Sequence, residues 1–249
     1  MPTDFGQSPT DTTGDSQAPG TLNALVDLVQ SHSSLVSVEV LRLAVAPSVE
    51  DRPGAQPQLR AYADEVRRVR FEGDSFTEAF LAAADRKDDL LSALSVVDYH
   101  QRFDDAAFAA SISRDDFTPE RIAALARETP PGQMLVLTSR VQTLQGTRHI
   151  PLLDFKIASS SGRNERAVRS VAERLGGGLL VDSGSSYHLY GLTLLDTENL
   201  VDWLLHAQLF SRCVDTRWVT HQLIERCAAL RVSQGGSKNV HPRLIARID

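Results

Sequence analysis

The sequence has 249 residues, of which 42% are hydrophobic and 23% charged. These values are typical of folded globular proteins and exclude disorder of the whole chain. No run of about 18 apolar residues is present, so we expect no membrane span. The first twenty residues lack the apolar core of a signal peptide, and we expect a cytoplasmic protein. The two cysteines, Cys213 and Cys227, are too few for a disulfide framework or a four-ligand zinc site.

The charge is distributed unevenly along the chain. Residues 1–130 hold 12 basic and 22 acidic side chains, whereas residues 131–249 hold 14 and 10. The whole chain carries −6, yet its second half has a net charge of +4. An anionic ligand is therefore compatible with the second half, and the acidic first half could bind a partner protein.

The sequence of the first half of the chain predicts a mainly helical region. Residues 1–20 are rich in Ser, Thr, Asp, Gly and Pro, so we expect a disordered tail. Between residues 21 and 130, apolar spacing predicts a helix over 22–29, a strand over 35–45, a loop over 47–57, helices over 59–69 and 76–97, and a helix that starts at Pro119. The segment Pro130–Gly132 is the predicted domain boundary.

Residues 131–249 predict a domain of the α+β class. The pattern predicts strands over 134–144, 149–157, 179–181, 187–195 and 228–232, and helices over 164–175, 199–210 and 217–226. Because strands that form hairpins alternate with helices, we expect a mixed sheet with helices on one face.

Two strands carry polar side chains at alternate positions. In the first, alternation places Asp154 and Lys156 on one face. They form either a structural ion pair or a metal-binding carboxylate beside an ammonium that contacts phosphate. In the second, Ser186 and His188 share a face after a Gly/Ser turn. Such a turn either cradles an anion or is a plain hairpin turn with a half-buried histidine.

Further candidates lie in helices and in the last predicted strand. Asp215 precedes a helix, where the ordinary role is N-capping. Arg163 and Arg166 begin a helix that follows a small-residue loop, which suits phosphate binding, although a solvated charged face is the common alternative. Arg231 adds a cation on the last predicted strand.

The order of these motifs resembles the archaeo-eukaryotic primase superfamily, the primase-polymerases. Leu152-Leu153-Asp154-Phe155-Lys156 is similar to its first acidic motif, Ser186-Tyr187-His188 to its second, and Val214-Asp215 to its third. The resemblance implies an RRM-like palm. It also implies that Asp154, His188 and Asp215 are catalytic, that the two acids hold Mg²⁺ or Mn²⁺, and that His188 contacts the nucleotide. Lys156, Ser186, Arg163, Arg166 and Arg231 are the other candidate contacts for the nucleotide or its phosphates.

The sequence departs from that family at one position. Lys156 stands where the first motif has its second acid, and an ammonium repels a metal ion. We therefore expect a primase-like protein that binds a nucleotide or single-stranded nucleic acid and whose nucleotidyltransferase activity is reduced or lost. An active primase-polymerase and a scaffold that binds a partner protein are the alternatives.

Overall fold

The computed structural model describes residues 18–52, 55–69, 76–234 and 240–249. The predicted tail over residues 1–17 lies outside this part of the chain. Residues 18–20, predicted to belong to the tail, open the first helix instead. No helix in the described residues is both long and apolar enough to cross a membrane.

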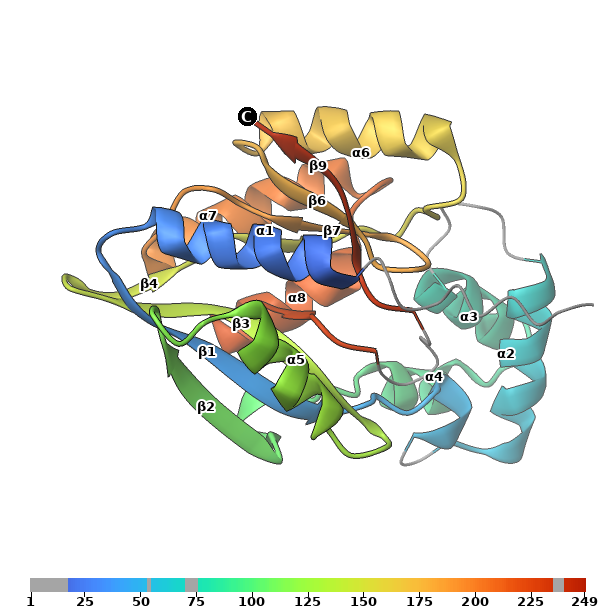
Figure 1. Cartoon of the computed structure of the whole chain (residues 1–249). Helices are drawn as coiled ribbons and strands as arrows, with labels where there is room; N and C mark the ends of the chain where they lie inside the picture. The colour runs from blue at the N-terminus through green and yellow to red at the C-terminus, as the bar shows by residue number, and fades with distance from the viewer. Residues whose placement is uncertain (1–17, 53–54, 70–75, 235–239) are drawn as a thin grey trace, which may run out of the picture.

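The described part of the chain contains both helices and strands, and three of the helices follow one another between β1 and β2 (Figure 1). The helices are α1 (Ala18–Ser31), α2 (Pro57–Val69), α3 (Phe76–Asp85), α4 (Leu90–Val97), α5 (Pro119–Arg127), α6 (Gly162–Arg174), α7 (Thr197–Ala207) and α8 (Thr216–Glu225). The strands are β1 (Leu35–Ala44), β2 (Phe108–Ser113), β3 (Gln133–Thr143), β4 (Gly146–His149), β5 (Leu152–Asp154), β6 (Gly178–Asp182), β7 (Tyr187–Tyr190), β8 (Ala229–Arg231) and β9 (Arg243–Ile248). Three 3₁₀ turns at Val49–Asp51, Phe103–Asp105 and Gln208–Phe210 complete the described elements.

The strands form two sheets, and this confirms the predicted α+β class. The larger sheet has the order β2-β1-β3-β4, and β8 also pairs with β3. The smaller sheet has the order β5-β7-β6-β9. Every strand pair in the described residues is antiparallel, whereas the sequence pattern predicts one mixed sheet. The segment predicted as one strand over 149–157 is divided near Pro151, and its two parts belong to different sheets.

The larger sheet crosses the boundary that we placed at Pro130–Gly132. β1 lies between β2 and β3, and its pairing with β3 runs from Leu35 opposite Thr143 to Ala44 opposite Gln133. β1 and β3 pack on a common core, so residues on both sides of that boundary form one sheet.

Apolar side chains fill the space between and behind the two sheets. The main core joins α1 and α5 to both sheets, with Leu25, Val40, Leu137 and Leu152 among its buried members. A second core lies between the smaller sheet and α6, α7 and α8. Burial of this kind is the principal source of stability, at roughly 25 cal/mol per Å² of apolar surface.

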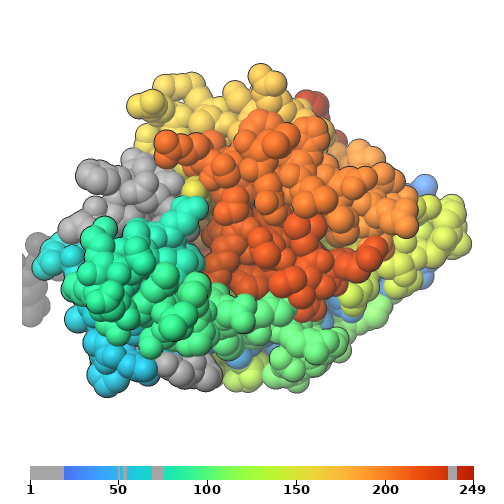
Figure 2. All heavy atoms as spheres, turned by 180° about the vertical axis from the view of Figure 1, so that it is seen from behind, coloured from blue at the N-terminus to red at the C-terminus, as the bar shows by residue number. Residues whose placement is uncertain are grey.

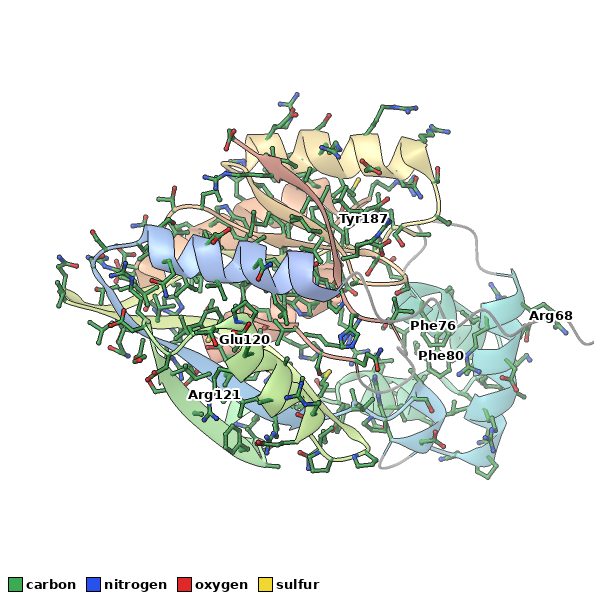
Figure 3. The ribbon with its side chains drawn as sticks, viewed as in Figure 1. Arg68, Phe76, Phe80, Glu120, Arg121 and Tyr187 are labelled. Carbon is green, nitrogen blue, oxygen red and sulfur yellow. The ribbon has the colours of Figure 1, made fainter. Side chains whose placement is uncertain are left out.

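A helical insert, residues 45–107, connects β1 to β2 and lies beside the sheets (Figure 1). Because Arg42 near the end of β1 pairs with Phe108 at the start of β2, the chain leaves and re-enters the larger sheet at the same end of these two strands. Helices α2, α3 and α4 share a small apolar core of their own. In it, the rings of Phe76 and Phe80 pack together with centres 6.0 Å apart (Figure 3). The predicted helix over 76–97 is broken here, since Asp88 adopts a φ of 60° between α3 and α4.

Candidate functional site

A cleft of about 500 Å³ lies where both sheets, α8 and the helical insert meet. Seen from behind, the insert packs directly against the surface that contains α8 (Figure 2). The polar groups from the smaller sheet and its loops are Asp154, Ser183, Ser186 and His188, and α8 with its cap adds Asp215, Arg217 and His221. The larger sheet contributes Leu43, Met134, Val136, Ala229, Leu230 and Arg231. The cleft is therefore charged on one side and largely apolar on the other.

Main-chain pairing brings the three predicted motifs together at this cleft. Asp154 on β5 lies opposite His188 on β7 in the register of the smaller sheet. On the other side of β5, Phe155 forms a β-bridge with Val214, and the main-chain N–H of Asp215 donates to the Asp154 carbonyl at 3.1 Å. Three segments far apart in the sequence are thus consecutive neighbours in space.

The side chains of these motifs face the same space. His188 Nε2 lies 3.7 Å from Asp154 Oδ1, which is an ion-pair distance and too long for a direct hydrogen bond. The Asp154 side chain is 24% exposed and that of His188 is 8% exposed. Asp215 Oδ1 accepts from the Trp218 N–H at 3.0 Å, so this carboxylate caps α8 while it lines the cleft.

Lys156 does not line the cleft. Its main-chain N–H donates to the Cys213 carbonyl at 2.8 Å, which continues the pairing beside β5. Burial raises the pKa of the Cys213 thiol, and the positive charge of Lys156 opposes that rise. The ammonium therefore acts beside Cys213, on the side of β5 that faces the start of α8.

Arg231 is a buried cation at the cleft. Its guanidinium donates to the main-chain carbonyls of Ser183, at 2.6 Å, and Val240, at 3.1 Å, and to that of Ser233. Burial lowers the pKa of Arg231, and the charge of Asp154 counteracts this effect. These hydrogen bonds link three segments of the chain. Because the acceptors are neutral carbonyls, they do not neutralise the guanidinium, and Arg231 retains its positive charge beside the cleft.

Two further predicted phosphate contacts lie outside the cleft, as Lys156 does. Arg163 and Arg166 are exposed on α6 and do not line the cleft. On that helix, Glu165 pairs instead with Arg169 at 2.8 Å. The solvated-helix alternative fits these arginines, because α6 covers the far face of the smaller sheet.

One wall of the cleft, formed by the helical insert, has no counterpart among the sequence motifs. Arg52, Tyr99, His100, Gln101 and Phe103 line the cleft from that side. Arg217 on α8 donates to the main-chain carbonyls of Val97, at 2.9 Å, and Tyr99, at 3.1 Å. Pairing of this kind between distant segments has no periodic signature in the sequence.

Beside Arg217, two histidines form a chain of hydrogen bonds from α8 to the insert. Arg217 Nε donates to His221 Nε2 at 3.2 Å, His221 Nδ1 lies 2.6 Å from His100 Nδ1, and His100 Nε2 lies 2.6 Å from Glu225 Oε1. Because Arg217 can only donate, His221 carries its proton on Nδ1 and donates to His100, which donates to Glu225. We call these four residues the Arg–His–His–Glu clasp.

The hydrogen bonds of the clasp require a neutral imidazole at His221. Burial, followed by the positive charge of Arg217, lowers the pKa of His221 to about 4. His100 and Arg52 also contribute to this lowering, and the charge of Asp215 opposes it. His221 is therefore neutral near pH 7, as the direction of its hydrogen bonds requires.

Comparison with known proteins decides the family. Residues 113–243, more than half of the chain, match the family described as AEP-like: Archaeo-eukaryotic primase 1D-like. The chain belongs to this archaeo-eukaryotic primase-like family. The resemblance that we noted from three short motifs is thereby confirmed, and all three motifs fall inside the matched residues. No curated protein and no solved structure matches the chain.

Membership of a primase-like family raises the question of metal ions. Phosphoryl transfer with two cations needs several carboxylates around ions about 3.5–4 Å apart. The cleft offers Asp154 and Asp215, and no group of three or more His, Cys, Asp or Glu side chains in the described residues could hold a metal ion. Asp182, the other acid near this strand, accepts from the Gly184 N–H at 2.7 Å. These residues do not fit a two-cation centre, although two carboxylates and a ligand's phosphates suffice for one Mg²⁺.

Proposed function

We propose that this primase-like protein binds a nucleoside triphosphate in the cleft and that its nucleotidyltransferase activity is reduced or lost. The observation that carries the proposal is the convergence of Asp154, His188 and Asp215 on one cleft, with Lys156 at the position of the missing acid. The nucleotide-facing motifs remain together, whereas the carboxylates fall short of a two-cation centre in the part of the chain that the structure describes.

The two-sided character of the cleft supports this class of ligand. Nucleoside triphosphates carry a charged tail and a flat, weakly polar base. Arg217, Arg231 and His188 offer cationic or hydrogen-bonding groups, and Met134 and Val136 offer apolar surface on β3. The volume of about 500 Å³ lies within the usual range for a small-molecule site.

Calorimetric titration with ATP and GTP tests the proposal directly. We expect binding by the wild type without a metal ion, and a loss of at least tenfold in affinity for His188→Ala. The matched control is His206→Ala, which removes an exposed imidazole at the end of α7 and leaves affinity unchanged. Absence of binding by the wild type, or equal effects of the two substitutions, would contradict the proposal.

An active nucleotidyltransferase is the second candidate. It is favoured by the closeness of two acids, since the Asp215 N–H donates to the main-chain carbonyl of Asp154. Extension of a primed template with Mn²⁺ and nucleotides tests it. Product made by the wild type and lost in Asp154→Ala/Asp215→Ala would favour this candidate. Product that persists in the double variant would exclude this site.

Single-stranded nucleic acid is the other ligand that a primase-like cleft would take. The cationic groups at the cleft predict an affinity that falls steeply with salt, because phosphate contacts release counterions. Binding of a fluorescent oligonucleotide at rising salt measures this slope. No detectable binding at low salt would leave the free nucleotide as the proposed ligand.

A further inference from the structure

We propose that Tyr99 of the helical insert is the residue that stacks on the base of the bound nucleotide and so sets specificity for a base-containing ligand. The inference rests on the proposed nucleotide-binding function. It concerns a part of the chain that lies outside the residues matched by the primase-like family, 113–243.

The packing of the cleft aromatics singles out Tyr99. Trp218 packs against both large cores, and Phe103 packs against the small apolar cluster behind β1 and β3. Tyr99 lines the cleft and, among the described residues, belongs to none of the four apolar clusters. Tyr99 is an only partly buried residue that lines the cleft, so its surface is not wholly covered by protein. The Tyr99 ring therefore has no part in these apolar clusters, and the face that Arg52 does not cover is the one that a ligand would meet.

The ring of Tyr99 is held in place before any ligand arrives. The Arg52 guanidinium lies 5.3 Å from the centre of the ring, within the range of a cation–π contact. Arg52 is itself held by the main-chain carbonyls of Pro47, at 3.3 Å, and Val96, at 3.1 Å. A ring that is already ordered loses little conformational entropy on binding.

The main chain of Tyr99 is also fixed relative to the charged side of the cleft. Arg217 donates to its carbonyl at 3.1 Å, and the next residue, His100, belongs to the clasp. Hydrogen bonds therefore hold the Tyr99 segment against α8, the helix whose N-cap residue Asp215 lies beside Asp154. This attachment makes the distance between Tyr99 and the motif residues a fixed property of the fold.

Stacking chemistry explains why a tyrosine suits this place. A base stacked on an aromatic side chain gains enough free energy that removal of the ring weakens binding by about tenfold or more. The contact is indifferent to which base is present, because every base has a π-face. Tyr99 would thus distinguish nucleotides from phosphate compounds that have no ring.

The experiment compares ATP with inorganic triphosphate by calorimetric titration of the full-length protein. In Tyr99→Ala and Tyr99→Leu we expect ATP affinity to fall about tenfold, with triphosphate affinity unchanged within about twofold. Tyr99→Phe, the matched control, retains the ring and should keep wild-type affinity for ATP. Thermal melting of each variant verifies that it is folded, and the leucine variant preserves side-chain bulk if alanine disturbs the insert.

The outcomes separate this inference from the proposed function. Equal losses for ATP and triphosphate, or unchanged ATP affinity in both non-aromatic variants, would overturn the role of Tyr99 and leave nucleotide binding intact. A wild-type protein that binds triphosphate as tightly as ATP would also overturn it. Failure of the wild type to bind either compound would overturn the proposed function, and this inference with it.

Discussion

Asp154 and His188 face each other across the paired strands β5 and β7, with Oδ1 of the aspartate 3.7 Å from Nε2 of the histidine. Successive side chains in a strand point to opposite faces, so Leu153 and Leu189 point from the same strands into the core. A register slip of one residue would turn the polar pair toward the second core and displace the leucines from it. The packing of Leu153 and Leu189 in that core therefore fixes the geometry of the site on the opposite face.

Replacement of Lys156 by alanine should leave ATP affinity within about twofold of the wild type. The reason is its position, because Lys156 does not line the cleft and its charge acts beside Cys213. Calorimetric titration measures the affinity, with His188→Ala as the variant that should lose it. A loss of more than tenfold for Lys156→Ala would mean that the ammonium reaches the phosphates of the bound ligand.

Substitution of Gly178 should destabilise the smaller sheet. A Cβ at this position would lie 2.5 Å from the Tyr190 carbonyl oxygen, and the φ of +154° strains any other residue. We expect Gly178→Ala to lower the free energy of unfolding by about 2 kcal/mol or more. Urea unfolding measures this change. Gly162→Ala is the matched control, because a Cβ at that position would have no neighbour within 4 Å, and its effect should stay below about 1 kcal/mol.

The sequence is informative wherever the signal is local. Thr118 accepts from the Arg121 N–H and Asp215 from the Trp218 N–H, as capping chemistry predicts. Alternation identifies the motif strands because it separates Leu153 and Phe155, which are buried in one core, from Asp154, which faces the cleft. Periodicity and cap residues are properties of a few consecutive positions, so one sequence is enough to read them.

Pairing between segments that are far apart in the sequence cannot be predicted from periodicity and cap residues. The sequence analysis includes the segment Phe108–Ser113 in the mainly helical region and predicts no strand there. In the structure this short strand, β2, has a single fully buried residue, Ile112. It becomes a strand only by pairing with β1, whose partner residues lie 66 to 76 positions away in the sequence. β9 likewise exists because it completes the smaller sheet beside β6. The contact between the insert and α8 depends on Arg217, whose acceptors are carbonyls more than a hundred residues distant.

Acid should destabilise the fold through His149. This buried imidazole lies 2.9 Å from Ser139 Oγ and 3.1 Å from Thr197 Oγ1, and burial followed by the charge of Arg140 lowers its pKa to about 4. The unfolded chain takes up the proton near pH 6.5 and the folded chain only near pH 4. The contribution of the neutral His149 imidazole to the free energy of unfolding is thus complete above pH 6.5 and is lost as pH falls toward 4.

The size of this acid effect is up to about 3 kcal/mol, because the pKa of His149 falls from 6.5 in the unfolded chain to about 4 in the folded chain. Urea unfolding at several pH values, for the wild type and His149→Gln, measures it. The difference in unfolding free energy between the two proteins should narrow by about that amount from pH 7 to pH 4, because the glutamine does not titrate. A difference that stays constant with pH would contradict the prediction.

Local opening at the clasp is a separate consequence of pH. In the docked insert, His221 Nε2 accepts a hydrogen bond from Arg217, so a proton added at this nitrogen removes the acceptor and breaks the chain. Since the pKa of His221 is lowered to about 4, the docked state is favoured above pH 6.5 and loses that advantage as pH falls toward 4.

Hydrogen exchange, corrected for the intrinsic effect of pH, should show protection of residues 97–103 falling at least tenfold between pH 7 and pH 5. Strand β3 serves as the internal reference and should keep its protection, and the exposed His206→Gln is the control substitution. Protection of residues 97–103 that does not change with pH would show that the insert is held by contacts other than the clasp.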